Sequence, residues 1–139
     1  MSSAAEARFR IQAPPPTART VAVVPLDAVS ERLTTGLSEH AWNGVTFVPA
    51  SAAARFATDP GPADLVMMVV AAGTDASAAV AIGETCSQRR IPTATCVIRD
   101  AATSEDDLST TLGRIRPWSL MVVVVSDRGY LEDILRSFR

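Results

Sequence analysis

The stretch from residue 63 to residue 98 constrains the fold of this chain more than any other. It opens with an apolar run, Leu65 to Val70, and closes with a second one that ends at Ile98. Six residues are too few for a globular helix, and the run lacks the alternation of a half-exposed strand. Such runs are typical of parallel strands that are buried on both faces. Because a turn at Gly73, a helical stretch to Arg90 and a turn at Pro92 separate the two runs, the sequence predicts a strand-helix-strand unit.

The rest of the chain repeats this alternation of strand and helix. Strict alternation predicts a parallel sheet with helices on both faces. We therefore expect a three-layer α/β fold of the flavodoxin-like or Rossmann-like kind, with five strands in the order 2-1-3-4-5. The other predicted strands are residues 20–26, 45–48 and 120–125, and the other predicted helices are 27–41, 51–57, 104–116 and 130–138.

Two of the predicted strands differ in apolar character. The run from Val45 to Val48 is short, and we expect it to lie at an unprotected edge of the sheet. The run from Leu120 to Val125 is wholly apolar, so we expect it to be well covered. Because an uncovered edge pairs readily with other strands, the sequence predicts that another chain could pair at residues 45–48.

Length and composition predict one domain after a tail. Residues 1–19 lack apolar periodicity and contain Pro14-Pro15-Pro16, so we expect a flexible, proline-containing tail before a single α/β domain at residues 20–139.

The charge and the apolar runs bear on partners and location. The net charge of -2 argues against binding to nucleic acid, whose phosphates attract basic surfaces. No run reaches the roughly 18 apolar residues of a membrane span. With no secretory signal pattern either, we expect a cytoplasmic protein.

The inventory of reactive side chains is short. All 13 basic residues are Arg, which excludes Schiff-base chemistry and any nucleotide site built on a lysine. The single histidine, His40, excludes an HExxH zinc site, and we expect it to cap a helix end. Cys86 and Cys96 are expected to be small buried apolar groups in a reducing compartment. The sequence therefore leans away from an enzyme.

A candidate ligand site lies where the predicted strand order reverses. In open parallel sheets, ligands bind beyond the carboxyl ends of the strands at that point, here between the loops after the first and third strands. Gly73 permits a tight turn, and amides at a following helix start can hold an anion. The candidate ligand-binding residues are Asp27, Gly73, Thr74 and Ser77. The alternative is a capped turn with no ligand, and the carboxylate of Asp75 would repel a phosphate.

Four aspartates follow predicted strands and form a second candidate site. Carboxylate oxygens are the ligands that Mg²⁺ prefers, so a ring of them at one end of the sheet could bind the ion. Aspartate is also an ordinary residue for starting a helix, which leaves capping as the alternative. The candidate metal ligands are Asp27, Asp75, Asp100 and Asp127.

A group of segments between residues 63 and 138 follows the pattern of a known family. The segments are Ala63–Val66, Gly73-Thr74, Ile91–Thr93 and Leu120–Val125 with the following Ser126-Asp127. In these segments the chain resembles the later part of the GTPase domain of the bacterial tubulin-like cell-division family, and the resemblance implies a nucleotide-binding-like fold. That family's phosphate loop is reduced to Gly73-Thr74, and its N-terminal glycine motif has no counterpart before Asp27, so the resemblance does not extend to GTP hydrolysis.

These observations favour a non-catalytic protein-interaction or accessory module that self-associates or binds a protein partner. The predicted last helix carries an apolar stripe suited to an interface. Its members are Tyr130, Leu131, Ile134, Leu135 and Phe138. Two alternatives stay open: a sensor or carrier of a small anionic ligand such as a nucleotide or phosphate compound, and a Mg²⁺-dependent enzyme that uses the strand-end aspartates.

Overall fold

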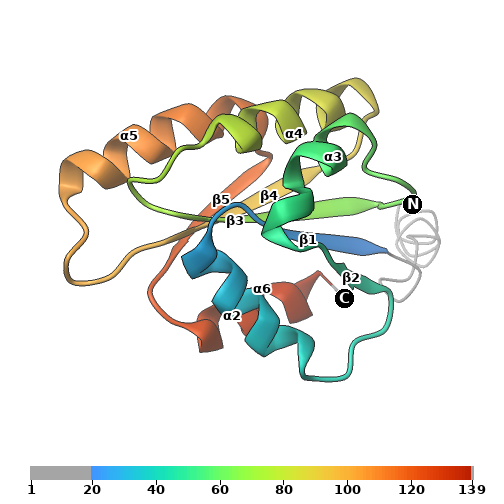
Figure 1. Cartoon of the computed structure of the whole chain (residues 1–139), viewed down its shortest axis with the longest axis horizontal. Helices are drawn as coiled ribbons and strands as arrows, with labels where there is room; N and C mark the ends of the chain where they lie inside the picture. Colours follow the sequence, from blue (N-terminus) through green and yellow to red (C-terminus); the bar gives the residue numbers. More distant parts are fainter. Residues whose placement is uncertain (1–19, 139) are drawn as a thin grey trace, which may run out of the picture.

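The structure, a computed structural model, describes residues 20–138 of the 139-residue chain. The predicted proline-containing tail, residues 1–19, lies outside the described residues. From Thr20 onward, strands and helices alternate along the chain (Figure 1).

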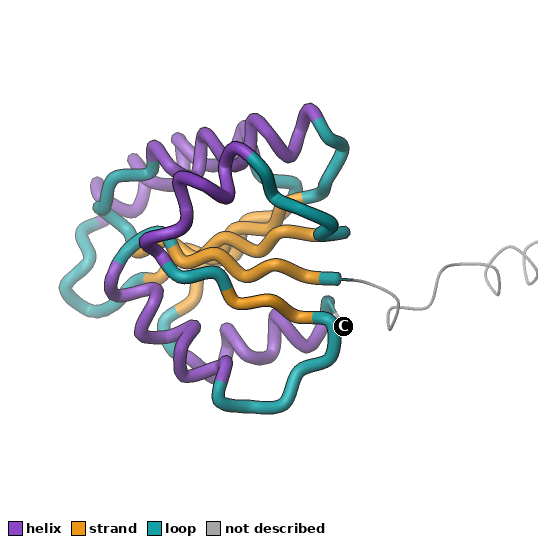
Figure 2. Tube along the Cα trace, turned by 45° about the vertical axis from the view of Figure 1, so that its right-hand side comes forward, coloured by secondary structure: helices purple, strands orange, loops and turns teal. Residues whose placement is uncertain are grey.

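Five strands form one all-parallel sheet in the order β2-β1-β3-β4-β5, which confirms the predicted fold class and strand order. Figure 2 shows the sheet as a layer between helices on either side. The order reverses between β1 and β3, so the loops that follow these two strands lie next to each other. The strands are β1 (Val21–Pro25), β2 (Val45–Phe47), β3 (Leu65–Ala71), β4 (Thr93–Ile98) and β5 (Met121–Val125).

Helices cover both faces of the sheet. Three lie on one face, namely α3 (Ala53–Thr58), α4 (Ser77–Gln88) and α5 (Glu105–Ile115), and two lie on the other, α2 (Ala28–Ser38) and α6 (Arg128–Ser137) (Figure 1). Short 3-10 turns, η2 (Ala50–Ala52) and η3 (Arg116–Trp118), precede α3 and β5.

The central strands supply both halves of the core. In β3, Val66, Met68 and Val70 pack toward α3, α4 and α5, whereas the alternate residues Met67 and Val69 pack toward α2 and α6. All five side chains are fully buried. Because each face of the strand meets a helical layer, β3 needs apolar residues at every position, which is the pattern that the sequence shows.

The last strand is not covered as the sequence suggested. Leu120 is 81% exposed, Met121 39% and Val124 40%, and within β5 only Val125 is buried. The prediction that this run is well covered was wrong, because β5 lies at the end of the sheet and, among the described strands, pairs only with β4. Its faces are partly covered, since Val122 packs toward α5 and Val123 toward α6, but within residues 20–138 no strand pairs with its outer edge.

The opposite edge is formed by β2, as predicted. This strand has only three residues, and Pro49 follows it closely. Val45 and Phe47 turn toward the core, where the Phe47 ring meets the Trp42 ring at 6.5 Å between centroids. So short a strand presents few free backbone groups, which is one way in which proteins protect a sheet edge.

Among the helices of residues 20–138, none combines the length and the apolar character needed to cross a bilayer.

Candidate functional site

The crevice at the point where the strand order reverses is organised by Asp27. Its Oδ1 accepts a hydrogen bond from the amide of Ser30 at 2.8 Å and so caps α2. Its Oδ2 accepts from the amide of Ala71 at 2.8 Å, and the Thr74 hydroxyl oxygen lies 3.4 Å from the same Oδ2. The structure therefore brings two of the predicted ligand-binding residues, Asp27 and Thr74, into contact.

Gly73 lies in the same crevice, in a conformation that favours glycine. Its φ is +87°, and its amide donates to the Thr111 hydroxyl at 2.9 Å. A Cβ at this position would lie 3.1 Å from the Oδ2 of Asp107. The loop after β3 is thus held against α5, and the carboxylate beside it makes the position unfavourable for an anion.

The remaining donors of the predicted anion site bind groups of the protein itself. The amide and hydroxyl of Thr74 both donate to the Ala71 carbonyl, at 3.2 and 2.7 Å. The amide of Ser77 donates to Asp75 Oδ1 at 3.0 Å, and the Ser77 hydroxyl donates to the same oxygen. The hydroxyl bond has the larger effect and the amide bond the next largest, and both lower the pKa of Asp75 below its usual range. An anion would have to displace an ionised carboxylate here.

The four strand-end aspartates do not assemble into a metal site. Asp100 accepts from the Ala102 amide at 2.8 Å, and Asp127 caps α6 by accepting from the Tyr130 amide at 3.0 Å. Within residues 20–138, no three carboxylate, histidine or cysteine side chains are grouped so that they could hold a metal ion. The structure does not bring the four predicted magnesium ligands together, because each carboxylate accepts from an amide of its own loop or helix start.

A cavity of about 410 Å³ lies at the other end of the sheet, where β4 and β5 begin. We call it the amino-end pocket. Two of its polar groups bind groups of the protein itself: the Thr93 hydroxyl donates to the Trp118 carbonyl at 2.7 Å, and the Ser119 hydroxyl donates to the Ile115 carbonyl at 2.9 Å. The pocket is lined by Gly83, Ser87, Arg90, Ile91, Pro92, Thr93, Pro117, Trp118, Ser119 and Leu120.

A second cavity of about 610 Å³ lies between α3 and α4. Its wall is formed largely by small side chains, among them Ala54, Ala57, Ala78 and Ala81. Ser77, a predicted ligand residue, lines this cavity, whereas Asp27, Gly73 and Thr74 do not. The predicted four-residue site is therefore divided between two places.

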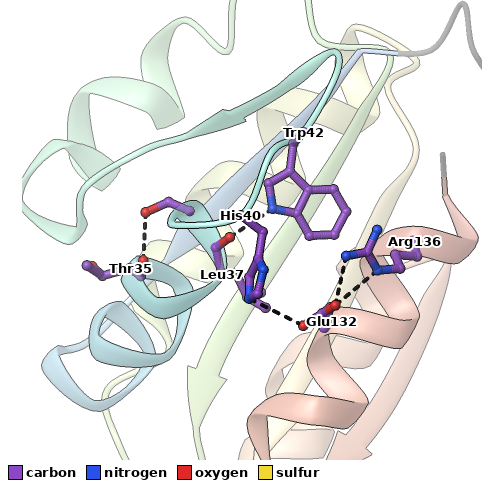
Figure 3. A network of polar contacts seen from close by, with 7 residues as sticks. Thr35, Leu37, His40, Trp42, Glu132 and Arg136 are labelled. Atoms are coloured by element: carbon purple, nitrogen blue, oxygen red, sulfur yellow. Dashed lines mark hydrogen bonds and ion pairs between the residues drawn. The ribbon is translucent and has the colours of Figure 1, made fainter.

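The single histidine belongs to a network that joins α2 to α6 (Figure 3). The Trp42 indole donates to the Leu37 carbonyl at 2.8 Å, and the Arg136 guanidinium lies 4.7 Å from the centre of the Trp42 ring. Arg136 also donates twice to Glu132 Oε2, at 3.0 and 2.8 Å, while His40 Nε2 lies 3.7 Å from Glu132 Oε1. The Arg136 bonds lower the pKa of Glu132. The histidine thus takes part in a structural contact between helices.

The apolar stripe predicted as an interface serves mainly the protein's own core. Leu131 and Leu135 are fully buried against the sheet, and Ile134 and Phe138 pack partly onto the same cluster. Only Tyr130, 61% exposed, points to solvent.

Both cysteines are buried, as the sequence predicted. Burial raises the pKa of Cys86, and it raises the pKa of Cys96 to about 12. A buried thiol with a raised pKa is a poor nucleophile at neutral pH.

The site that sequence reasoning missed is the outer edge of the last strand, which we call the β5 edge, Leu120 to Val125. The Val125 carbonyl accepts from the Arg99 amide at 2.9 Å, so this carbonyl faces β4. Because backbone groups alternate along a strand, those of Val123 also face β4, and those of Val122 and Val124 point outward. The sequence indicated this edge through the predicted strand order, in which the fifth strand comes last and so lies at an end of the sheet.

No protein-family model matches the chain, and no curated protein matches it either. What the structure defines is the class: an α/β protein with a five-stranded parallel sheet in the order 2-1-3-4-5.

Proposed function

We propose that this protein is a non-catalytic interaction module that self-associates by pairing along the β5 edge. The observation that carries the proposal is the exposure of Leu120, Met121 and Val124 on an unpaired edge strand, at 81%, 39% and 40%. Edge strands in stable monomers are shortened, charged, interrupted by proline or bulged. The sequence Met-Val-Val-Val-Val has no charge and no proline, so an aqueous monomer would leave a strong pairing template exposed.

The contrast between the two edges supports this choice. β2 has three residues and turns Val45 and Phe47 into the core, whereas β5 has five residues and leaves apolar side chains in solvent. Clustered exposed apolar residues mark interaction sites more often than single ones do. The β5 edge is therefore the better candidate for the contact with another chain.

The small-ligand alternative has weaker support. In the Asp27 crevice, the amides and hydroxyls that would hold an anion already bind carboxylates or carbonyls of the protein, and Asp107 lies beside Gly73. An enzyme based on a ring of aspartates has no support, because within residues 20–138 the four carboxylates do not gather at one point.

Sedimentation equilibrium of the purified protein tests the proposal. We expect a dimer, and we expect Val124→Lys to be monomeric, since a charge at this exposed position would be desolvated in a paired edge. The matched control is Thr46→Lys, an exposed position on the opposite edge strand, which should remain a dimer. Circular dichroism would verify that both variants keep the fold. A wild-type protein that stays monomeric across the micromolar range would overturn the proposal.

A further inference from the structure

We infer that the partner at the β5 edge is a second copy of this chain, paired antiparallel about a two-fold axis at Val123. This inference rests on the proposed function and gives it a geometry. The outward backbone groups of Val122 would exchange both hydrogen bonds with those of the partner's Val124, and the reverse pair would form by symmetry. Val123, whose own backbone groups face β4, would lie directly opposite the partner's Val123.

The strand is self-complementary in this register. Met121 lies opposite the partner's Val125 and Val122 opposite the partner's Val124, so every pair within the strand is apolar. Opposed apolar side chains are the unit by which paired strands stabilise each other. Leu120, the most exposed apolar side chain next to the edge, would lie beside the partner's Ser126.

Charge favours the antiparallel orientation. α5 packs against β4, and its apolar side shares a cluster with Val122, so this helix flanks the β5 edge on one face of the sheet. Its first turn holds Glu105, Asp106 and Asp107, and basic residues close it at Arg114 and Arg116. A two-fold axis places the acidic start of one α5 beside the basic end of the other. A parallel pairing would need a two-fold axis along the strands, which places the two α5 helices on opposite faces of the joined sheet, so this complementarity would be lost.

Closure of the assembly also favours this arrangement. Pairing β5 with β2 of another copy would leave a β5 and a β2 edge free at the two ends, so the contact would propagate into a filament. The three-residue β2 would also pair with only part of the five-residue β5. Antiparallel self-pairing uses the whole of β5 and joins the two sheets into one ten-stranded sheet. Only the short β2 edges then stay exposed.

The register can be tested by a single cysteine on the axis. In antiparallel pairs without mutual hydrogen bonds, opposed Cα atoms lie about 4.5 Å apart, within the range of a disulfide. Val123→Cys should therefore convert most of the chains to a disulfide-linked dimer under mild oxidation, seen as a doubled mass on a non-reducing gel. Cys86 and Cys96 are buried and should not interfere.

Controls separate the geometry from the association itself. Val122→Cys and Val124→Cys should each cross-link poorly alone and should cross-link when the two variants are mixed. If Val123→Cys fails to fold, this mixing experiment tests the register in its place. A dimer in which Val122→Cys alone cross-links, or in which Val123→Cys cross-links only to Thr46→Cys, would overturn this inference and leave the proposed self-association intact. A monomeric wild type would overturn both.

Discussion

The carboxylate of Asp27 accepts a hydrogen bond from the amide of Ala71 at 2.8 Å, across 44 residues of sequence. This bond joins the loops that follow β1 and β3, the two strands between which the sheet order reverses. The same carboxylate caps α2 through the Ser30 amide. A residue that the sequence offered as a ligand contact thus has two structural bonds in the folded chain.

Asp27→Ala should lower the free energy of unfolding by about 2.5 kcal/mol, since loss of a cap costs roughly 1 kcal/mol and loss of a charged hydrogen bond roughly another 1.5 kcal/mol. The matched variant is Asp127→Ala, which removes a helix cap at α6 for which residues 20–138 supply no second amide bond of this kind. It should cost only about 1 kcal/mol. Urea unfolding of both variants measures the difference, and equal losses would show that the Asp27–Ala71 bond contributes nothing measurable.

Two helix glycines differ sharply in the space around them. A Cβ at Gly83 of α4 would lie 2.3 Å from the Cβ of Trp118, whereas a Cβ at Gly113 of α5 would have no atom within 4 Å. Gly83→Ala should therefore destabilise the protein by about 1–3 kcal/mol through overpacking, despite the better helix propensity of alanine. We expect this loss as a lower midpoint of thermal unfolding.

Gly113→Ala is the internal control for that prediction. Alanine is favoured over glycine in an exposed helix interior, so this variant should gain up to about 1 kcal/mol. Stabilisation by both substitutions would mean that the η3 segment moves away from α4 at little cost, and that the close approach of Trp118 to Gly83 does not fix how this segment packs.

The sequence predicted the fold class because its strongest signal depends on burial at every position of a strand. Leu65 to Val70 can be apolar throughout only if both faces are covered, and β3 is buried on both faces. The same rule failed for β5. Apolar character shows that a strand needs a cover, and it does not say whether that cover comes from its own chain or from another. The strand order was the better guide, because it places β5 at an edge.

The candidate site was less predictable, for a related reason. The stripe on α6 correctly indicated a one-sided helix, and periodicity cannot tell a core from an interface, so Leu131 and Leu135 proved to be core residues. Likewise, an aspartate after a strand fits a metal site and a helix cap equally well in sequence. The choice is made by amides of the same loop, such as that of Tyr130 for Asp127, whose positions only the folded backbone fixes.

The Glu132–Arg136 pair predicts an acid-sensitive ion pair within α6, beside the point where Glu132 meets His40. The hydrogen bonds from Arg136 hold the pKa of Glu132 below its ordinary value of 4.5. Since the folded pKa is lower than the unfolded one, the stabilisation is fully present above pH 4.5 and is lost as the pH falls through the folded value. The free-energy difference between the wild type and Glu132→Gln should therefore be smaller well below pH 4.5 than at pH 7.

Chemical unfolding at a series of pH values measures that difference. Asp133→Asn is the matched variant, because it removes the next carboxylate of the same helix, and Asp133 makes none of the ion pairs found within residues 20–138. The free-energy difference between Asp133→Asn and the wild type should not shrink in the same way below pH 4.5, because Asp133 is not paired with Arg136. A Glu132→Gln difference that does not change between pH 7 and acid would argue that the pair gives no net stabilisation.

The buried thiols give a prediction about accessibility that also bears on the cross-linking experiment. Cys96 is 1% exposed and Cys86 0%, and burial raises the pKa of Cys96 from an ordinary value of 9.0 to about 12. At pH 8 neither side chain is ionised or reachable in the folded protein, so a thiol reagent should modify them only through unfolding. For the wild type we expect negligible labelling without denaturant and two labels per chain in urea. Val123→Cys should add one thiol that is labelled in the native protein. The labelling of this thiol should fall as the protein concentration rises, because dimer formation covers it. Rapid labelling of the native wild type would show that the sheet around Cys96 opens far more often than its complete burial implies.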